Sequence, residues 1–291
     1  MLYGGMMKNI IYSIYIENNE PNLSEKHQFT KIQLAKHYQR LIDVKKEYAK
    51  HCNAEYRLYE NDTYWQKFKK KFSGYQFDII NLYKIHIWEK LGEEFDNVLY
   101  FDFDVVPNTT ESFFEKFDMN KICVHAPNAT KENIWSTSAL KRYKKQINTY
   151  EEIVSNFDGY SMYVKAIAKK SMLALDNNFD SNYLIANTAI LGGNSNAIKQ
   201  LKYTEKLDEL LDVLYTAKKE KLFGEEISKQ FFPNNEVFFH YLLDKYNIDW
   251  FNLPKEWHTY VMPEDEHTKE LKSAKLIHLI SKKFEKLWEI I

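Results

Sequence analysis

The segment that most constrains the fold is NVLYFDFDVVPN, residues 97–108, in which an apolar run ends in two aspartates one residue apart. A run of valine, leucine, tyrosine and phenylalanine is typical of a buried strand. Because side chains alternate along a strand, Asp102 and Asp104 are expected to point the same way as Val98 and Tyr100. A buried carboxylate is costly unless it is paired or binds a cation. The end of this strand is therefore expected to be a functional site.

Strand-like and helix-like patterns alternate along the chain around this segment. Besides it, strands are predicted at residues 8–16, 55–60, 121–127, 183–193, 248–254 and 274–281. Helices are predicted at residues 31–51, 78–90, 109–117, 194–222 and 233–246, with a basic patch on a helix or loop at 66–72. A polar loop is expected at 17–30, a helix stop at Gly92 and a glycine turn at 192–193. This order predicts an α/β fold with a single central, mostly parallel sheet flanked by helices.

The chain is expected to form one large domain, because it has 291 residues, of which 44% are hydrophobic. Residues 128–180 show no clear period and are predicted to be an insertion or lid within that domain. The 40 basic and 41 acidic side chains nearly cancel, so no global field favours nucleic acid or an acidic membrane as the main partner.

A cytoplasmic location is expected from three further features. No apolar run approaches the roughly 20 residues that cross a bilayer. The opening residues lack the pattern of a signal peptide. Cys52 and Cys123 lie far apart, which indicates neither a disulfide framework nor a zinc knuckle.

The position of the two aspartates suggests a metal site. Ligands bind at the carboxyl ends of strands in open α/β sheets. Two carboxylates there would supply half a site for Mg²⁺ or Mn²⁺, which leaves open positions for phosphate oxygens. Two solvated acids at a strand end remain the alternative.

Residues 97–107 resemble the metal-binding Asp-x-Asp strand of GT-A glycosyltransferases, in particular the glycogenin-like and bacterial lipopolysaccharide galactosyltransferase-like group. Phe103 is bulkier than the usual middle residue. Further segments follow in the family's order: NLYKIHIW (81–88), YLIANTAILGG (183–193), NNEVFFHYLL (234–243) and KLIHLISKKFEKLW (275–288). The resemblance implies a GT-A fold and transfer of a sugar from a nucleotide-diphosphate donor, with a UDP-sugar favoured, to a hydroxyl acceptor such as a glycan.

The resemblance also implies a metal set. Asp102, Asp104 and His278 would bind Mn²⁺ or Mg²⁺, or Asp102 would contact the ribose instead. Such a cation would stabilise the negative charge that develops on the leaving diphosphate. Without the resemblance, an ordinary, partly buried core histidine is the favoured interpretation of His278.

Besides Asp102, five residues are candidates for donor binding. Lys84 and either Lys282 or Lys283 would add positive charge beside the diphosphate. Tyr12 and Ser13, in the first strand, would lie under the nucleotide base. For Lys84 the alternative is a solvated helix face. For Lys282 and Lys283 it is a surface charge pair, and for Tyr12 it is ordinary core packing.

Two residues are candidates for the catalytic and acceptor site. Asn187 has an amide able to bind sugar hydroxyls, and the alternative is a turn-capping asparagine. Glu236 would take the acceptor's proton in an inverting enzyme or orient the sugar in a retaining one, and the resemblance favours retention. A carboxylate at the start of a helix is also favourable for the helix dipole alone.

Other readings of the same residues stay open. FDFDVV also resembles the nucleophile motif of haloacid-dehalogenase-like phosphatases, in which Asp102 would attack phosphorus and Asp104 would act as acid and base. That family needs its motif on the first strand, whereas here a strand, a helix and a strand precede it. A catalytically inactive glycan-binding scaffold is a third reading. The basic clusters at 66–72 and 140–146 leave nucleic acid or a membrane surface open as the acceptor.

Overall fold

The structure, a computed structural model, describes residues 7–17, 23–72, 79–126, 184–209, 235–261 and 268–291 and the single positions 165, 169 and 211. Its strands are β1 (Asn9–Ile14), β2 (Ala54–Tyr59), β3 (Asn97–Phe101), β4 (Val105–Pro107), β5 (Ile122–His125), β6 (Asn187–Asn194), β7 (Trp250–Asn252), β8 (Thr259–Tyr260) and β9 (Leu276–His278). Its helices are α1 (Glu25–His51), α2 (Thr63–Lys71), α3 (Ile79–Glu94), α4 (Phe113–Lys116), α9 (Ser195–Leu201), α12 (Asn235–Lys245), η1 (Lys255–Trp257), α13 (Thr268–Ser273) and α14 (Phe284–Trp288). The insertion predicted at 128–180 lies outside the described residues, apart from 165 and 169.

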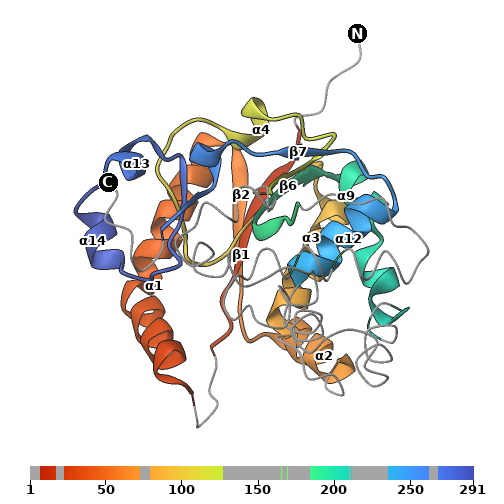
Figure 1. The fold of residues 1–291 in the computed structure, drawn as a ribbon, viewed down its shortest axis with the longest axis horizontal. Helices are drawn as coiled ribbons and strands as arrows, with labels where there is room; N and C mark the ends of the chain where they lie inside the picture. Colours follow the sequence, from red (N-terminus) through yellow and green to blue (C-terminus); the bar gives the residue numbers. More distant parts are fainter. Residues whose placement is uncertain are drawn as a thin grey trace, which may run out of the picture.

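A six-stranded sheet in the order β2-β1-β3-β6-β5-β7 forms the centre of the molecule. β1 runs parallel to β2 and β3, β5 runs parallel to β7, and β6 lies antiparallel between β3 and β5. In Figure 1 the sheet stands between α1 on one side and α3, α9 and α12 on the other. The predicted α/β fold with a central, mostly parallel sheet flanked by helices is confirmed.

Alternate side chains of the central strands pack into different cores. Val98 and Tyr100 of β3 belong to the core under α2, α3, α9 and α12. Leu99 and Phe101 belong to the core on the opposite face, which includes Tyr48 of α1. Both faces are buried, which explains why the strand is almost continuously apolar.

Gly192 and Gly193 lie inside β6 and do not form the predicted turn. A Cβ atom on Gly192 would lie 2.5 Å from the ring of Phe113, and one on Gly193 would lie 3.3 Å from the ring of Trp88. The strand therefore carries glycine where a helix approaches each face closely.

The boundaries of α1 and α3 are among those that differ from the predictions. α1 begins at Glu25, within the predicted loop, and its N-cap Ser24 accepts a hydrogen bond from the backbone N–H of His27. α3 continues through Gly92 to its end at Glu94. A Cβ atom on Gly92 would lie 3.4 Å from Ile198, so this glycine allows α3 and α9 to pack closely and does not cap the helix.

The helix predicted from residue 194 is not continuous. α9 ends at Leu201, where the C-cap Lys202 adopts a left-handed conformation with φ of 47°. A second helical stretch follows at 203–209, and residues 212–222 of the prediction lie outside the described part of the chain. Within the described residues, every helix is too short or too polar to span a membrane.

A second, three-stranded sheet in the order β4-β9-β8 was not predicted. β9 pairs antiparallel with β4, placing His278 opposite Val105, and parallel with β8, placing His278 opposite Tyr260. His278 is thereby held on both sides, next to the turn that carries the aspartates.

Candidate metal and donor site

The two aspartates come together through a turn. β3 ends at Phe101, and the backbone N–H of Val105 donates to the carbonyl of Asp102 at 2.9 Å, closing a turn through residues 102–104. The expected strand alternation therefore does not reach Asp104, which lies in the turn and not on the strand, whereas Asp102 contacts Tyr100 as expected. The turn still delivers both carboxylates to the carboxyl end of β3, where the large and the small sheet meet.

Asp102, Asp104 and His278 form a group that fits a divalent cation. One ligand atom from each lies within 4.8 Å of the others, and Asp104 and His278 are buried. Two ligands on opposite sides of Mg²⁺ lie roughly 4.2 Å apart, so a small adjustment would close the group around such an ion. Carboxylate ligands suit both Mg²⁺ and Mn²⁺, and histidine is the commonest metal-binding side chain.

Asp104 contacts two positively charged or protonatable groups. Lys282 forms an ion pair with its Oδ2 atom, and Nε2 of His278 lies 3.4 Å from the same oxygen. Burial raises the pKa of Asp104, but the charge of Lys282 and the neighbouring His278 outweigh it and hold this pKa well below its ordinary value. Asp104 is therefore an ionised carboxylate that already attracts cations. Lys282 reaches it from a left-handed backbone conformation with φ of 56°.

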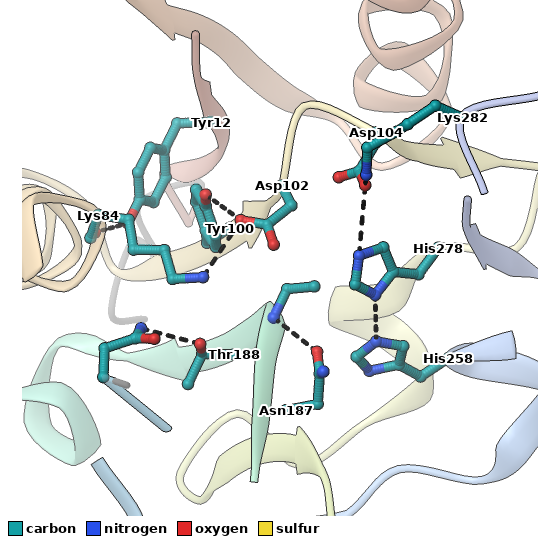
Figure 2. Close-up of polar contacts among 12 residues, drawn as sticks. Tyr12, Lys84, Tyr100, Asp102, Asp104, Asn187, Thr188, His258, His278 and Lys282 are labelled. Atoms are coloured by element: carbon teal, nitrogen blue, oxygen red, sulfur yellow. Dashed lines mark hydrogen bonds and ion pairs between the residues drawn. The ribbon is translucent and has the colours of Figure 1, made fainter. Parts of the chain in front are cut away.

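Asp102 is held from the α3 side of the site (Figure 2). Its Oδ1 atom accepts hydrogen bonds from Lys84 Nζ at 3.2 Å and from the hydroxyl of Tyr100 at 2.5 Å. Burial, and then the charge of Asp102, raises the pKa of Tyr100 well above its ordinary value, so this hydroxyl stays a donor. The side chain of Lys84 is only 6% exposed, so its ammonium is fixed beside the carboxylate.

The other candidate donor-binding residues are placed as follows. Tyr12 and Ser13 are fully buried. The Tyr12 hydroxyl donates to the carbonyl of Lys84 at 2.5 Å, and its ring centroid lies 4.9 Å from that of Tyr100. Tyr12 thus supports the backbone under Lys84. Lys283 is exposed and precedes α14. Contact of Tyr12, Ser13 or Lys283 with a donor stays a prediction.

The candidate catalytic residues lie on β6 and α12. Oδ1 of Asn187 accepts from the backbone N–H of Ala189 at 3.0 Å. Glu236, in the first turn of α12, forms an ion pair with Lys165. Asn235 next to it donates to Oγ1 of Thr188 at 2.9 Å, which joins the start of α12 to β6. The roles predicted for Asn187 and Glu236 in catalysis stay predictions.

The buried residue Lys45 was missed by the sequence analysis. It lies on α1 and donates from Nζ to the carbonyl of Phe103 at 2.8 Å and to that of Leu41 at 3.3 Å. Burial lowers its pKa to about 7, although the carboxylates of Asp104 and Asp102 act in the opposite direction. Because its ammonium bonds to the carbonyl of Phe103, Lys45 fixes the middle residue of the Asp-x-Asp turn. A lysine four residues after Leu41, on the apolar stripe of a helix, was the available signal.

His258 was also missed. It is fully buried, and its Nε2 atom lies 3.4 Å from Nδ1 of His278. Its ring packs against those of Tyr260, with centroids 4.7 Å apart, and His125, with centroids 5.5 Å apart. Burial, followed by the neighbouring His278, His125 and Lys84, holds the pKa of His258 well below its ordinary value. No spacing or motif marked this histidine.

No protein-family model matches the chain, and no curated protein is similar to it in sequence. Among solved structures, its fold is similar to a glycosyltransferase involved in glycosylation of the major capsid of PBCV-1, with a TM-score of 0.42 and 11% identity over 97% of both chains. It is also similar to mouse xyloside xylosyltransferase 1, with a TM-score of 0.44 and 12% identity over 94% of this chain and 98% of that one. A third is the galactosyltransferase LgtC in complex with donor and acceptor sugar analogues, with a TM-score of 0.41 and 9% identity over 97% of this chain and 94% of that one. Likeness at this level does not determine the chemistry of the chain.

Proposed function

We propose that the chain is a metal-dependent glycosyltransferase, which moves a sugar from a nucleotide-diphosphate donor to an acceptor hydroxyl. The observation that carries this proposal is the convergence of Asp102, Asp104 and His278 at the carboxyl end of β3, with Lys84 and Lys282 beside them. A cation site flanked by two lysines suits a reaction whose leaving group gains negative charge, as a diphosphate does.

Each residue of this group has an assigned task. Asp102, Asp104 and His278 would hold Mn²⁺ or Mg²⁺, which when bound supplies Lewis-acid stabilisation of the diphosphate. Lys84, held by its bond to Asp102, would keep a fixed positive charge next to the phosphates. Lys282 shares the Oδ2 atom of Asp104 with His278, so a cation on that oxygen would release its ammonium for a phosphate oxygen.

The exposure of Lys283 is the reason to assign the diphosphate contact to Lys282. We further assign Tyr12 and Ser13 to the base side of the donor, with a UDP-sugar favoured. Asn187 and Glu236 are assigned to the acceptor side, with a glycan as the favoured acceptor. Because Glu236 is already paired with Lys165, it suits orientation of a sugar better than removal of a proton, which fits retention.

The phosphatase reading is not favoured. The Asp-x-Asp turn follows β3, the third strand along the chain, whereas that reading requires the first. Oδ1 of Asp102, the supposed nucleophile, also accepts hydrogen bonds from both Lys84 and Tyr100, which reduce its reactivity. An inactive scaffold is distinguished from an enzyme by experiment.

The deciding experiment is a thermal-denaturation screen with UDP, GDP and CMP, each with Mn²⁺ and with EDTA. A ligand at about 100 times its dissociation constant adds about 2.7 kcal/mol, which corresponds to roughly 5 °C or more for a chain of this size. We expect one nucleoside diphosphate to give such a shift with Mn²⁺ only, and Asp104→Asn to abolish it.

Two results would contradict the proposal. Stabilisation by beryllofluoride with Mg²⁺, without any response to nucleotides, would favour the phosphatase. No change in melting temperature with any nucleotide or with beryllofluoride would favour the inactive scaffold.

A further inference from the structure

The ring of His278 presents its two nitrogen atoms to two different partners (Figure 2). Nε2 lies 3.4 Å from Oδ2 of Asp104, on the side of the carboxylates. Nδ1 lies 3.4 Å from Nε2 of His258. A neutral imidazole has one N–H and one lone pair, so a histidine that offers Nε2 to a cation must carry its proton on Nδ1.

That proton needs an acceptor, and His258 is placed to supply it. Metal-binding histidines nearly always donate their second ring nitrogen to a neighbouring group, which fixes tautomer and ring orientation. His258 is 0% exposed and His278 is 8% exposed, so there is little room for water to take over this role. In this arrangement Nε2 of His258 is the acceptor and its own proton is on Nδ1, a buried atom with no hydrogen-bond partner among the described residues.

The backbone holds both rings in place. His258 directly precedes β8, and its N–H donates to the carbonyl of Lys255 at 3.1 Å. His278 ends β9, and its carbonyl accepts from the N–H of Val261 at 3.0 Å. The pairing of β8 with β9 therefore sets the distance between the two imidazoles.

We propose that His258 is a positioning residue for the metal site: by accepting the Nδ1 proton of His278, it keeps Nε2 of His278 free for the cation. The proposal rests on the metal site of the proposed function. With the opposite tautomers the proton of His278 would sit on Nε2, between the ring and Asp104, and would exclude a cation there.

A purely structural role makes a different prediction. The ring of His258 packs on Tyr260 and His125, and a phenylalanine would preserve that packing. Two substitutions separate the roles. The amide of His258→Gln can reach the position of Nε2 and offer an oxygen to His278. The amide of His258→Asn ends near the position of Nδ1 and cannot reach.

The test is direct Mn²⁺ binding, measured from the EPR signal of free Mn²⁺, without any donor. We expect His258→Asn and His258→Phe to weaken binding about 10- to 100-fold, the range found when such supporting partners are removed. We expect His258→Gln to bind close to the wild-type level. Thermal denaturation in EDTA reports whether each variant is folded, and the Gln and Asn pair still decides if the Phe variant does not fold.

Each other outcome overturns the inference. Equal binding by all four proteins would leave His258 a packing residue. Loss of binding in His258→Gln as large as in His258→Asn would exclude the acceptor role. A wild type that binds no Mn²⁺ would remove the metal site itself. Nucleotide binding is measured separately, so failure of the transferase proposal can be told apart from failure of this one.

Discussion

At the scale of single residues, Asp104 joins the two halves of the site. Its carboxylate pairs with Lys282, whose side chain is only partly exposed, and also faces His278. Asp104→Asn would leave the ammonium of Lys282 without its partner. We expect the metal-free protein to lose about 1–3 kcal/mol of unfolding free energy, measured by urea denaturation in EDTA.

The matched double variant is Asp104→Asn with Lys282→Met, which leaves no unpaired ammonium. We expect it to be more stable than Asp104→Asn alone, because groups in direct contact are not additive. If the losses from the two single substitutions simply add, the ion pair does not stabilise the metal-free protein.

Lys45 of α1 supports the same site through its contact with the Asp-x-Asp turn. Its two hydrogen bonds hold the carbonyls of Phe103 and Leu41. Lys45→Met keeps the volume but frees the turn, so we expect Mn²⁺ binding to weaken about 10-fold, as for other supporting residues. The control is Lys46→Met, on the exposed side of the same helix. Equal Mn²⁺ affinity of the two variants would show that the turn does not need Lys45.

At the scale of elements, the longer strands and helices could be predicted because their hydrophobic periods extend over many residues. The small sheet could not, because β4, β8 and β9 have 3, 2 and 3 residues, too few for any period. This explains why some residues of the site were predicted and others were missed. Asp102, Asp104 and His278 carry a motif, whereas His258 depends on β8 and leaves no trace in the sequence.

The glycines of β6 allow a test of close packing between elements. Gly→Ala in a strand would otherwise stabilise by restricting the unfolded chain. At Gly192 the new Cβ would lie 2.5 Å from the Phe113 ring, so we expect Gly192→Ala to lower the unfolding free energy by about 1–3 kcal/mol. Gly193→Ala, with its nearest atom at 3.3 Å, should lose clearly less. Equal losses in urea denaturation would argue against the close approach of α4.

At the scale of the whole molecule, stability is expected to depend on pH through His86. Burial, and then the charges of Lys90 and Lys71, lowers its pKa from 6.5 to about 4. The unfolded chain therefore binds more protons between these values. The contribution of His86 to the unfolding free energy should be full above pH 6.5 and fall towards pH 4, by at most about 3 kcal/mol.

His86→Gln should make the curve less steep by this contribution, whereas the control His27→Gln, at an exposed histidine of α1, should not. Urea denaturation between pH 4 and pH 7 measures the difference. Parallel curves for wild type and His86→Gln would mean that His86 titrates normally.

The chain passes from the large sheet into the small sheet at the turn between β3 and β4, and the proposed cation would bridge the two sheets there. Asp102 and Asp104 belong to this turn, while His278 belongs to β9. Binding should therefore slow opening of the small sheet more than that of β2, at the far edge of the large sheet. Hydrogen exchange with and without Mn²⁺ should show added protection in β8 and β9, including the N–H of Val261, which bonds to His278. Asp104→Asn should remove this added protection. Protection spread evenly to β2 would mean that the cation stabilises the fold as a whole and does not link the two sheets.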